Sequence, residues 1–285
     1  MTLAPSLAPP PAAQSRTAPS SRAEARSLSS PSTLPLSTLV TGICSVTLRQ
    51  HDVDSVVSVA GAARLGGIEW GTDVHIRDAE SALHARAATL SAGLDILSLG
   101  SYYRAGTFGD FESVLNLASQ LGAPRIRIWA GGSGSADADA EYWQAVAGDA
   151  RRIADLSAER GMDIAFEYHG DTLTDSVEST LQLLHSVDRP NVGTYWQPAV
   201  GVSDQEALAS LRQLVGHVSG IHCFSWMPRI ERHALSDRKR LWQAVTDVLR
   251  ENGRQADMML EFVAGDLADN VLRDAGFLNH IALGE

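Results

Sequence analysis

The chain has 285 residues, of which 44% are hydrophobic and 20% are charged, as in ordinary folded domains. Its formal net charge of −11 argues against a nucleic-acid partner and against binding to an anionic membrane surface. No apolar run reaches the roughly 18 residues of a membrane span, and no segment reads as a signal-peptide core. The two cysteines, Cys44 and Cys223, lack metal-type spacing and indicate free buried thiols in a reducing compartment, so we expect a cytoplasmic protein.

Residues 1–36 differ in composition from the rest of the chain. They hold seven of the eleven prolines, mixed with Ala, Ser and Thr, and show no periodic apolar pattern. Such a segment cannot bury enough apolar surface to offset the entropy of ordering it. We therefore expect a disordered tail over 1–36 and one folded catalytic domain over 37–285.

From Leu39 onward, short apolar runs alternate with longer amphipathic ones. The expected strands are 39–48, 66–70, 94–100, 125–131, 163–170, 191–198, 220–226 and 258–263. The segments between them are long enough for helices, and such connections join parallel strands. Eight units of this kind predict a (β/α)8 TIM barrel, an α/β fold. A doubly wound open sheet is the main alternative, but no glycine-rich GxGxxG follows the first strand.

Helix boundaries are also readable. Gly66, Gly122 and Gly161 each end a helix-like segment just before the next strand, where a glycine is common. Thr174, followed by acids at 175 and 178, is expected to cap the helix that begins there.

Polar residues stand near the ends of the last four apolar runs. Alternate side chains of a strand share a face, so Glu167 lies among apolar neighbours in the run Ile164–Gly170. Burial of an unpaired carboxylate is costly, which indicates a cation or a polar cavity beside it. The later runs carry Gln197, His222 and Glu261 in similar places. Two carboxylates, an imidazole and an amide oxygen suit Mn²⁺, Mg²⁺ or Co²⁺, whereas each residue alone would be an ordinary polar residue of a barrel mouth.

The pair Glu167 and Glu261 suggests a reaction type. Moving a proton from a carbon next to a carbonyl needs a base, an acid on the other face and a Lewis acid for the enediolate oxygen. Two glutamates flanking one metal supply all three. A dehydratase or other lyase acting through the same intermediate would need the same set, so the product stays open.

The order of these motifs resembles the xylose isomerase-like TIM-barrel superfamily, in particular its sugar isomerase and epimerase branch. The resemblance covers roughly residues 38–280 and is strongest in FEYHGDTLTD, NVGTYWQP, IHCFSW and LEF. It implies that Glu167, Gln197, His222 and Glu261 hold a divalent metal, Mn²⁺ in the first place. Gln197 stands where the family usually has Asp, and it can ligate through its carbonyl oxygen but supplies no charge. The resemblance also suggests a homo-oligomer.

Further residues are candidates for substrate contact. Arg127 has inward parity and must pair, and Glu69 is the expected partner. Trp129 and Trp226 share the inward face, whereas Trp70 and Trp196 face the helices. The candidate substrate-binding residues are His169, His75, Glu69, Trp129, Trp226 and Arg232.

These observations support an enzyme with a small sugar substrate, with catalysis assigned to Glu167 and Glu261. The leading hypothesis is a metal-dependent isomerase or epimerase of a keto-sugar or related polyol. The alternatives are a metal-dependent lyase or dehydratase on an oxidised sugar or glycoside and, with less support, a non-catalytic sugar-binding barrel. A DNA-cleaving member of the same superfamily is disfavoured by the acidic charge and the few placed histidines.

Overall fold

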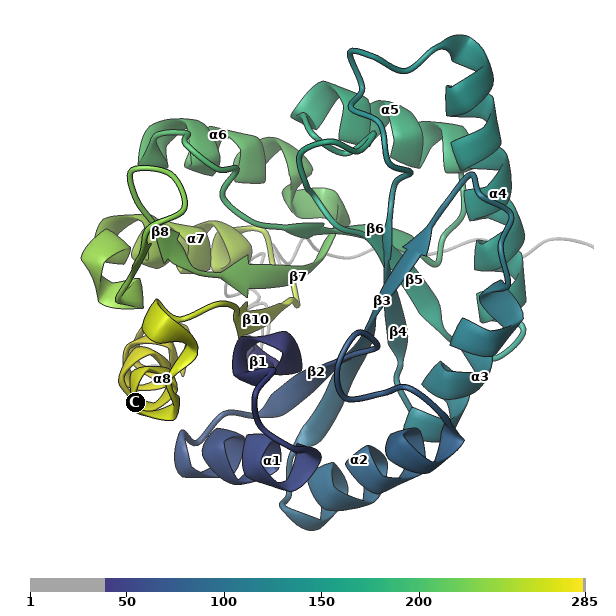
Figure 1. The fold of residues 1–285 in the computed structure, drawn as a ribbon. Coiled ribbons are helices and arrows are strands. Elements are labelled where there is room, and N and C mark those ends of the chain that lie inside the picture. The colour runs from purple at the N-terminus through teal and green to yellow at the C-terminus, as the bar shows by residue number, and fades with distance from the viewer. Residues whose placement is uncertain (1–38, 284–285) are drawn as a thin grey trace, which may run out of the picture. The chain divides into compact units, whose positions relative to one another are not determined.

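The computed structural model describes residues 39–283, which form a closed barrel of eight parallel strands surrounded by helices (Figure 1). Around the barrel the strands follow the order β1-β10-β7-β6-β5-β4-β3-β2. The predicted (β/α)8 barrel is confirmed. The expected tail, residues 1–36, lies outside the described residues.

The barrel strands are β1 Val40–Cys44, β2 Gly67–Gly71, β3 Asp95–Arg104, β4 Arg125–Trp129, β5 Asp163–Phe166, β6 Val192–Trp196, β7 Val218–Cys223 and β10 Asp257–Leu260. The helices are α1 Val53–Ala62, α2 Ala79–Ser91, α3 Phe111–Leu121, α4 Ala140–Ala158, α5 Val177–Val187, α6 Asp204–Leu214, α7 Lys239–Glu251 and α8 Ala268–Leu283. Two short strands, β8 Ser225–Trp226 and β9 Arg232–His233, pair antiparallel in the loop after β7. No helix of the described part is long and apolar enough to cross a membrane.

Side-chain caps begin the helices that follow the strands. The N-cap side chains of Asp52, Asp78, Asp110 and Asp139 each accept a hydrogen bond from a backbone N–H in the first turn of α1 to α4. The expectation that Thr174 caps the next helix was wrong. Ser176 caps α5, while the Thr174 hydroxyl donates to the carbonyl oxygen of Glu167 at 2.5 Å.

Several predicted strands were too long at their C-terminal ends. The run 39–48 is a strand only to Cys44 and continues as the 3₁₀ turn Ser45–Leu48. The runs 163–170 and 258–263 end at Phe166 and Leu260. An apolar run continues wherever the chain is buried, whereas the strand ends where ladder hydrogen bonds stop.

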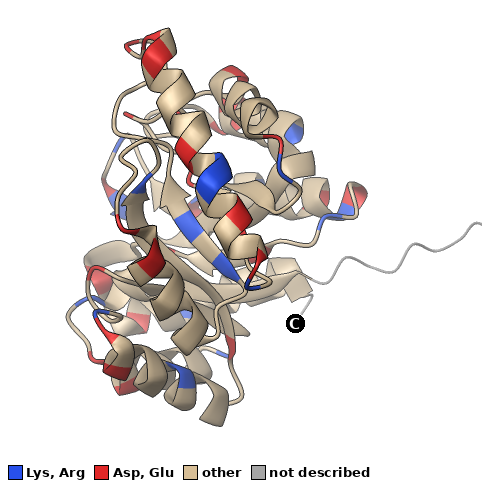
Figure 2. Cartoon of the chain, turned by 90° about the vertical axis from the view of Figure 1, so that its right-hand side faces the viewer, with Lys and Arg blue, Asp and Glu red and all other residues tan. Residues whose placement is uncertain are grey.

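Two apolar clusters hold the fold together. The larger lies between the barrel and the helices and includes Trp70 and Trp196, as predicted. The smaller fills part of the barrel interior and consists of Cys44, Val46, Leu97, Ala165, Tyr195 and Met259. The interior also holds the buried polar residues Glu69, Ser98, Arg127 and His222, which are unusual in a packed barrel core and mark this region for chemistry. On the side that Figure 2 shows, acidic and basic segments are interspersed over the helices.

Candidate active site

The four predicted metal ligands meet at the C-terminal end of the barrel, on the neighbouring strands β5, β6, β7 and β10. His222 lies in β7, whereas Glu167, Gln197 and Glu261 each come directly after the last residue of their strand. Two of these positions are still fixed by one backbone hydrogen bond each to the neighbouring strand. The N–H of Glu167 donates to the Ile128 carbonyl oxygen at 2.9 Å and that of Glu261 to the Cys223 carbonyl oxygen at 3.1 Å.

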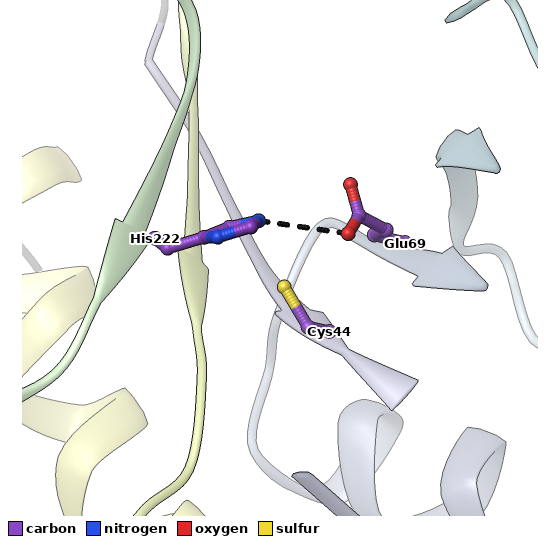
Figure 3. Close-up of side chains that lie close together, drawn as sticks. All are labelled: Cys44, Glu69 and His222. Atoms are coloured by element: carbon purple, nitrogen blue, oxygen red, sulfur yellow. Dashed lines mark ion pairs between the residues drawn. The ribbon is translucent and has the colours of Figure 1, made fainter. Parts of the chain in front are cut away.

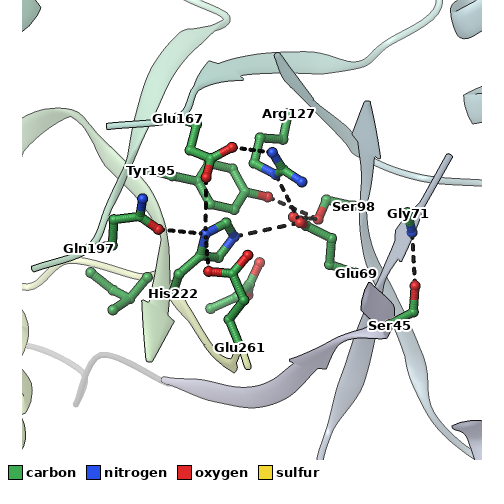
Figure 4. A network of polar contacts seen from close by, with 12 residues as sticks. Ser45, Glu69, Gly71, Ser98, Arg127, Glu167, Tyr195, Gln197, His222 and Glu261 are labelled. Atoms are coloured by element: carbon green, nitrogen blue, oxygen red, sulfur yellow. Dashed lines mark hydrogen bonds and ion pairs between the residues drawn. The ribbon is translucent and has the colours of Figure 1, made fainter. Parts of the chain in front are cut away.

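The imidazole Nδ1 of His222 is the centre of this group (Figure 4). It lies 3.1 Å from Gln197 Oε1, 3.4 Å from Glu261 Oε2 and 3.9 Å from Glu167 Oε1. All four residues are buried, and the most exposed of them, Gln197, has 7% of its surface accessible. Such a convergence of anionic groups on one imidazole nitrogen requires compensating positive charge.

Part of that charge comes from Arg127 of β4. Its Nε donates to Glu69 Oε1 at 2.9 Å, and its Nη1 donates to Glu167 Oε2. The predicted pairing of Arg127 with Glu69 is confirmed. Because Arg127 binds one oxygen of Glu167, the other oxygen of that carboxylate is left facing His222.

Burial and charge shift the pKa values of the group. Burial raises the pKa of Glu261, and the charges of Glu167 and Glu69 raise it further. His222 and Arg127 lower this pKa, but only in part. Burial opposes the charged form of His222, yet Glu261, Glu69 and Glu167 together raise its pKa. The site therefore favours a positive charge at the position of Nδ1, either a proton or a metal ion.

The donor set fits a divalent cation. Two ligands bound at about 2.1 Å with angles between a right angle and a tetrahedral angle are about 3.0–3.4 Å apart. The distances from Nδ1 to Gln197 and Glu261 match this separation, and Glu167 would need to approach by about half an ångström to match it. The atoms of Glu167, His222 and Glu261 lie within 4.8 Å of one another. Two carboxylates, one amide oxygen and one imidazole are donors suited to Mn²⁺, Mg²⁺ or Co²⁺.

A second group of possible ligands lies deeper in the barrel and shares His222. It consists of Cys44, Glu69 and His222, whose ligand atoms are also within 4.8 Å of one another (Figure 3). Burial and the charge of Glu69 raise the pKa of the Cys44 thiol well above its ordinary value. Cys44 and Cys223 are both buried free thiols, as predicted.

A cavity of about 500 Å³ opens directly above the four ligands. Among its lining residues are Glu167, Gln197 and Glu261, the guanidinium of Arg127 and the aromatic residues Tyr102, Trp129, Tyr168, Phe224, Trp226 and Phe262. A larger cavity of about 750 Å³ lies at the opposite end of the barrel and contains none of the candidate ligands. In TIM barrels, chemistry is located at the C-terminal ends of the strands, so the smaller cavity is the candidate active site.

Three of the predicted substrate-binding residues line this cavity. Trp129 and Trp226 lie on its wall, in agreement with their predicted inward parity, and the ring of His169 lies 4.6 Å from that of Trp129. The indole nitrogens of both tryptophans are buried and have no hydrogen-bond acceptor among residues 39–283. Their roles in substrate binding remain predictions.

The other three predicted substrate-binding residues lie behind the cavity wall. His75 is buried between the Ser45 hydroxyl and the His51 carbonyl oxygen, each 3.0 Å from a ring nitrogen. Arg232 donates to Asp266, and its guanidinium lies 4.8 Å from the centre of the Phe262 ring. Glu69 lies below the ligands and contacts Arg127 and Ser98. None of the three is among the residues that line the cavity.

Sequence reasoning missed several lining residues. Tyr102 follows the expected end of its strand at residue 100, but β3 continues to Arg104 and brings the ring 6.2 Å from that of Trp129. Alternation along a longer strand would have identified it. Phe262 has a positive φ of 49°, which turns the chain directly after Glu261, and no residue pattern indicates that turn.

Comparison with known proteins agrees with this architecture. Residues 59–280 match the family described as the xylose isomerase-like TIM barrel. A 3-dehydroshikimate dehydratase of Bacillus anthracis is 29% identical over 164 residues, which is 53% of this chain and 58% of that protein. The chain thus spans little more than half the length of this curated relative.

Solved structures with the same fold include two kinds of enzyme. The structure of a probable 3-DHS dehydratase of Bacillus anthracis superposes with a TM-score of 0.68 at 20% identity, covering 85% of this chain and 98% of the other. A 3-keto-D-glucoside 4-epimerase of E. coli superposes with a TM-score of 0.65 at 12% identity, covering 85% and 99%. These identities establish the fold alone. The family match, which covers most of its length, shows that the chain belongs to the xylose isomerase-like TIM-barrel family.

Proposed function

We propose that the protein is a divalent-metal-dependent dehydratase, a lyase, that acts on a small cyclic keto acid of the 3-dehydroshikimate type. The observation that carries this proposal is the convergence of Glu167 and Glu261 on His222 Nδ1 at the floor of an aromatic-walled cavity. The dehydratase outcome is supported by the Bacillus relative, which is 29% identical over 164 residues. The metal is Mn²⁺ in the first place, with Mg²⁺ and Co²⁺ as alternatives.

The roles of the side chains follow from their surroundings. Glu261, whose pKa is raised by burial, is placed to accept the proton from the carbon next to the substrate carbonyl. The electron pair of that C–H bond forms a C=C bond. The hydroxyl on the adjacent carbon takes up the proton that Glu261 accepted and leaves as water, which returns Glu261 to its ionised form. A bound divalent cation would supply Lewis-acid polarisation of the carbonyl oxygen.

Other residues orient the substrate and keep water away. Arg127 fixes Glu167 in one orientation, so its free oxygen stays directed at His222. The rings of Trp129, Trp226 and Phe262 form flat apolar walls, which suit the faces of a six-membered ring better than an extended chain. His169 stands beside Trp129 and donates its Nδ1–H to the Gly170 carbonyl oxygen at 2.7 Å, so its Nε2 can accept a hydrogen bond from a substrate hydroxyl.

An epimerase is the second candidate, because the same proton abstraction begins both reactions and epimerases share the fold. In that reaction Glu167 would return the proton to the opposite face of the carbon. A solvent-deuterium experiment separates the two. Mn²⁺-loaded protein is incubated in D₂O with 3-dehydroshikimate and, separately, with keto-sugars, and the products are identified by NMR. Loss of water supports the dehydratase, whereas deuterium in an inverted, intact substrate supports the epimerase.

The two glutamates are tested by Glu167→Gln and Glu261→Gln. Each substitution removes a ligand charge, and Glu261→Gln also removes the proton acceptor, so we expect kcat to fall by about 10²–10⁴-fold. The exposed Glu178 of α5 offers a matched control, Glu178→Gln, which should retain full activity. Deuterium exchange that continues at the wild-type rate in both active-site variants would remove these residues as the proton-transfer pair.

A further inference from the structure

Glu69 is a buried carboxylate to which no catalytic step has been assigned. It lies in the middle of β2, 2% exposed and outside the cavity. Its Oε1 accepts from Arg127 Nε at 2.9 Å, and its Oε2 accepts from the Ser98 hydroxyl at 2.6 Å (Figure 4). Gly100 of β3 leaves the room for this pair. A Cβ at that position would lie 2.8 Å from Arg127 Nη2 and 2.9 Å from Glu69 Oε1.

His222 presents its second ring nitrogen to the same carboxylate. Nδ1 faces Gln197 and Glu261, whereas Nε2 is buried and makes no hydrogen bond with residues 39–283. Glu69 Oε1 lies 3.5 Å from Nε2, slightly beyond hydrogen-bond distance. A histidine that binds a metal through one nitrogen usually donates its other N–H to a carboxylate or carbonyl, which fixes the ring and the tautomer.

Resting on the function proposed above, we propose that Glu69 is a positioning residue for the metal site. Its carboxylate accepts a hydrogen bond from the Nε2–H of His222 and thereby directs the Nδ1 lone pair at the metal. Through Arg127 the same carboxylate also fixes Glu167, because one guanidinium donates to both acids. One buried side chain therefore aligns two ligands that come from β5 and β7.

A competing use of Glu69 is as a metal ligand together with Cys44 and His222 (Figure 3). The contacts of Glu69 argue against it. Arg127 and Ser98 already occupy both oxygens, and a cation between Cys44 and His222 would have to displace these donors. An imidazole N–H needs no such displacement.

Mn²⁺ affinity of the full chain, measured by isothermal titration calorimetry without substrate, tests the proposal. We expect Glu69→Gln to weaken Mn²⁺ binding by about 10–100-fold. Glu69→Asp keeps the charge but withdraws it by one methylene, so it should also weaken binding, which separates positioning from net charge. Ser98→Ala, which leaves the carboxylate in place, should weaken it less. Asp257, paired with Arg125, offers Asp257→Asn as a control at an ion pair away from the ligands, with affinity close to wild type.

The absorption spectrum of the Co²⁺ form locates the metal directly. We expect no thiolate-to-cobalt absorption in the wild type, and a changed ligand-field spectrum in Glu69→Gln. Thiolate absorption that is lost in Cys44→Ser but kept in Cys223→Ser would place the ion in the deeper group and overturn the proposal. Wild-type Mn²⁺ affinity in folded Glu69→Gln and Glu69→Asp would also overturn it while leaving the proposed function intact. Failure of the wild type to bind Mn²⁺ or Co²⁺ at all would overturn both.

Discussion

At the scale of single residues, the most important difference from the ligand set that the resemblance implies is Gln197, which stands in place of an aspartate. Its Oε1 lies 3.1 Å from His222 Nδ1, so an amide oxygen lies where the family resemblance implies a charged ligand. We expect Gln197→Asp to tighten Mn²⁺ binding by about tenfold, or about 1.4 kcal/mol, because another anionic ligand joins the site. The metal-free variant should unfold at a lower temperature than the wild type, since a third carboxylate then faces Glu167 and Glu261 without a cation. Calorimetric titration and thermal unfolding measure the two effects.

The exposed Gln213 of α6 provides the matched control. Gln213→Asp adds the same charge to the protein without placing it at the site, and it should change neither quantity. Weaker Mn²⁺ binding by Gln197→Asp would mean that the longer amide side chain is needed for reach, or that Gln197 is not a ligand.

At the scale of the elements, the helix caps link stability to pH. Hydrogen bonds from the backbone and hydroxyl of Ser81 lower the pKa of Asp78, the N-cap of α2. A lowered carboxyl pKa means that the folded state favours the ionised form. The stabilisation is fully present above the ordinary aspartate pKa of about 3.9 and is lost as the pH falls through the lower pKa of the folded state. Asp52 and Asp110 have caps of the same kind with lowered pKa values.

Asp78→Asn tests this link, because asparagine caps a helix about as well but does not titrate. We expect the melting temperature of the variant to fall less than that of the wild type between pH 5 and about pH 3. Asp247→Asn, at an exposed position inside α7, should follow the wild-type curve. An identical acid response of Asp78→Asn and wild type would show that the cap charge does not contribute.

At the scale of the whole molecule, the proposed metal would join four adjacent strands at one end of the barrel. Binding to the folded state alone stabilises by about 2.7 kcal/mol when the free ion is about 100-fold above its dissociation constant. For a domain of this size we expect the melting temperature to rise by about 5–10 °C with Mn²⁺ and to return to the metal-free value with a chelator. Differential scanning calorimetry measures it. Glu261→Gln should show a much smaller rise, and an equal rise in that variant would locate the bound ion elsewhere.

The sequence by itself determined the fold class and the set of converging residues. Alternation of apolar runs with helix-length segments predicted the eight-stranded barrel, because periodicity reports burial directly. The same runs placed Glu167, Gln197, His222 and Glu261 at strand ends, and parallel strands bring such ends together. Inward parity likewise indicated that Arg127 must pair inside the barrel.

Only the tertiary structure decided at which residue each strand ends and which residues contact each other across the barrel. The apolar segments around Glu167 and Glu261 continue beyond the last residue of their strands, so composition could not predict where the strands end. Glu69 of β2 and His222 of β7 are 153 positions apart (222 − 69), and their approach depends on how far the barrel curves and on the room left by Gly100. No local sequence pattern predicts the distance between Glu69 and His222, because that distance is set by the closed sheet and not by either strand.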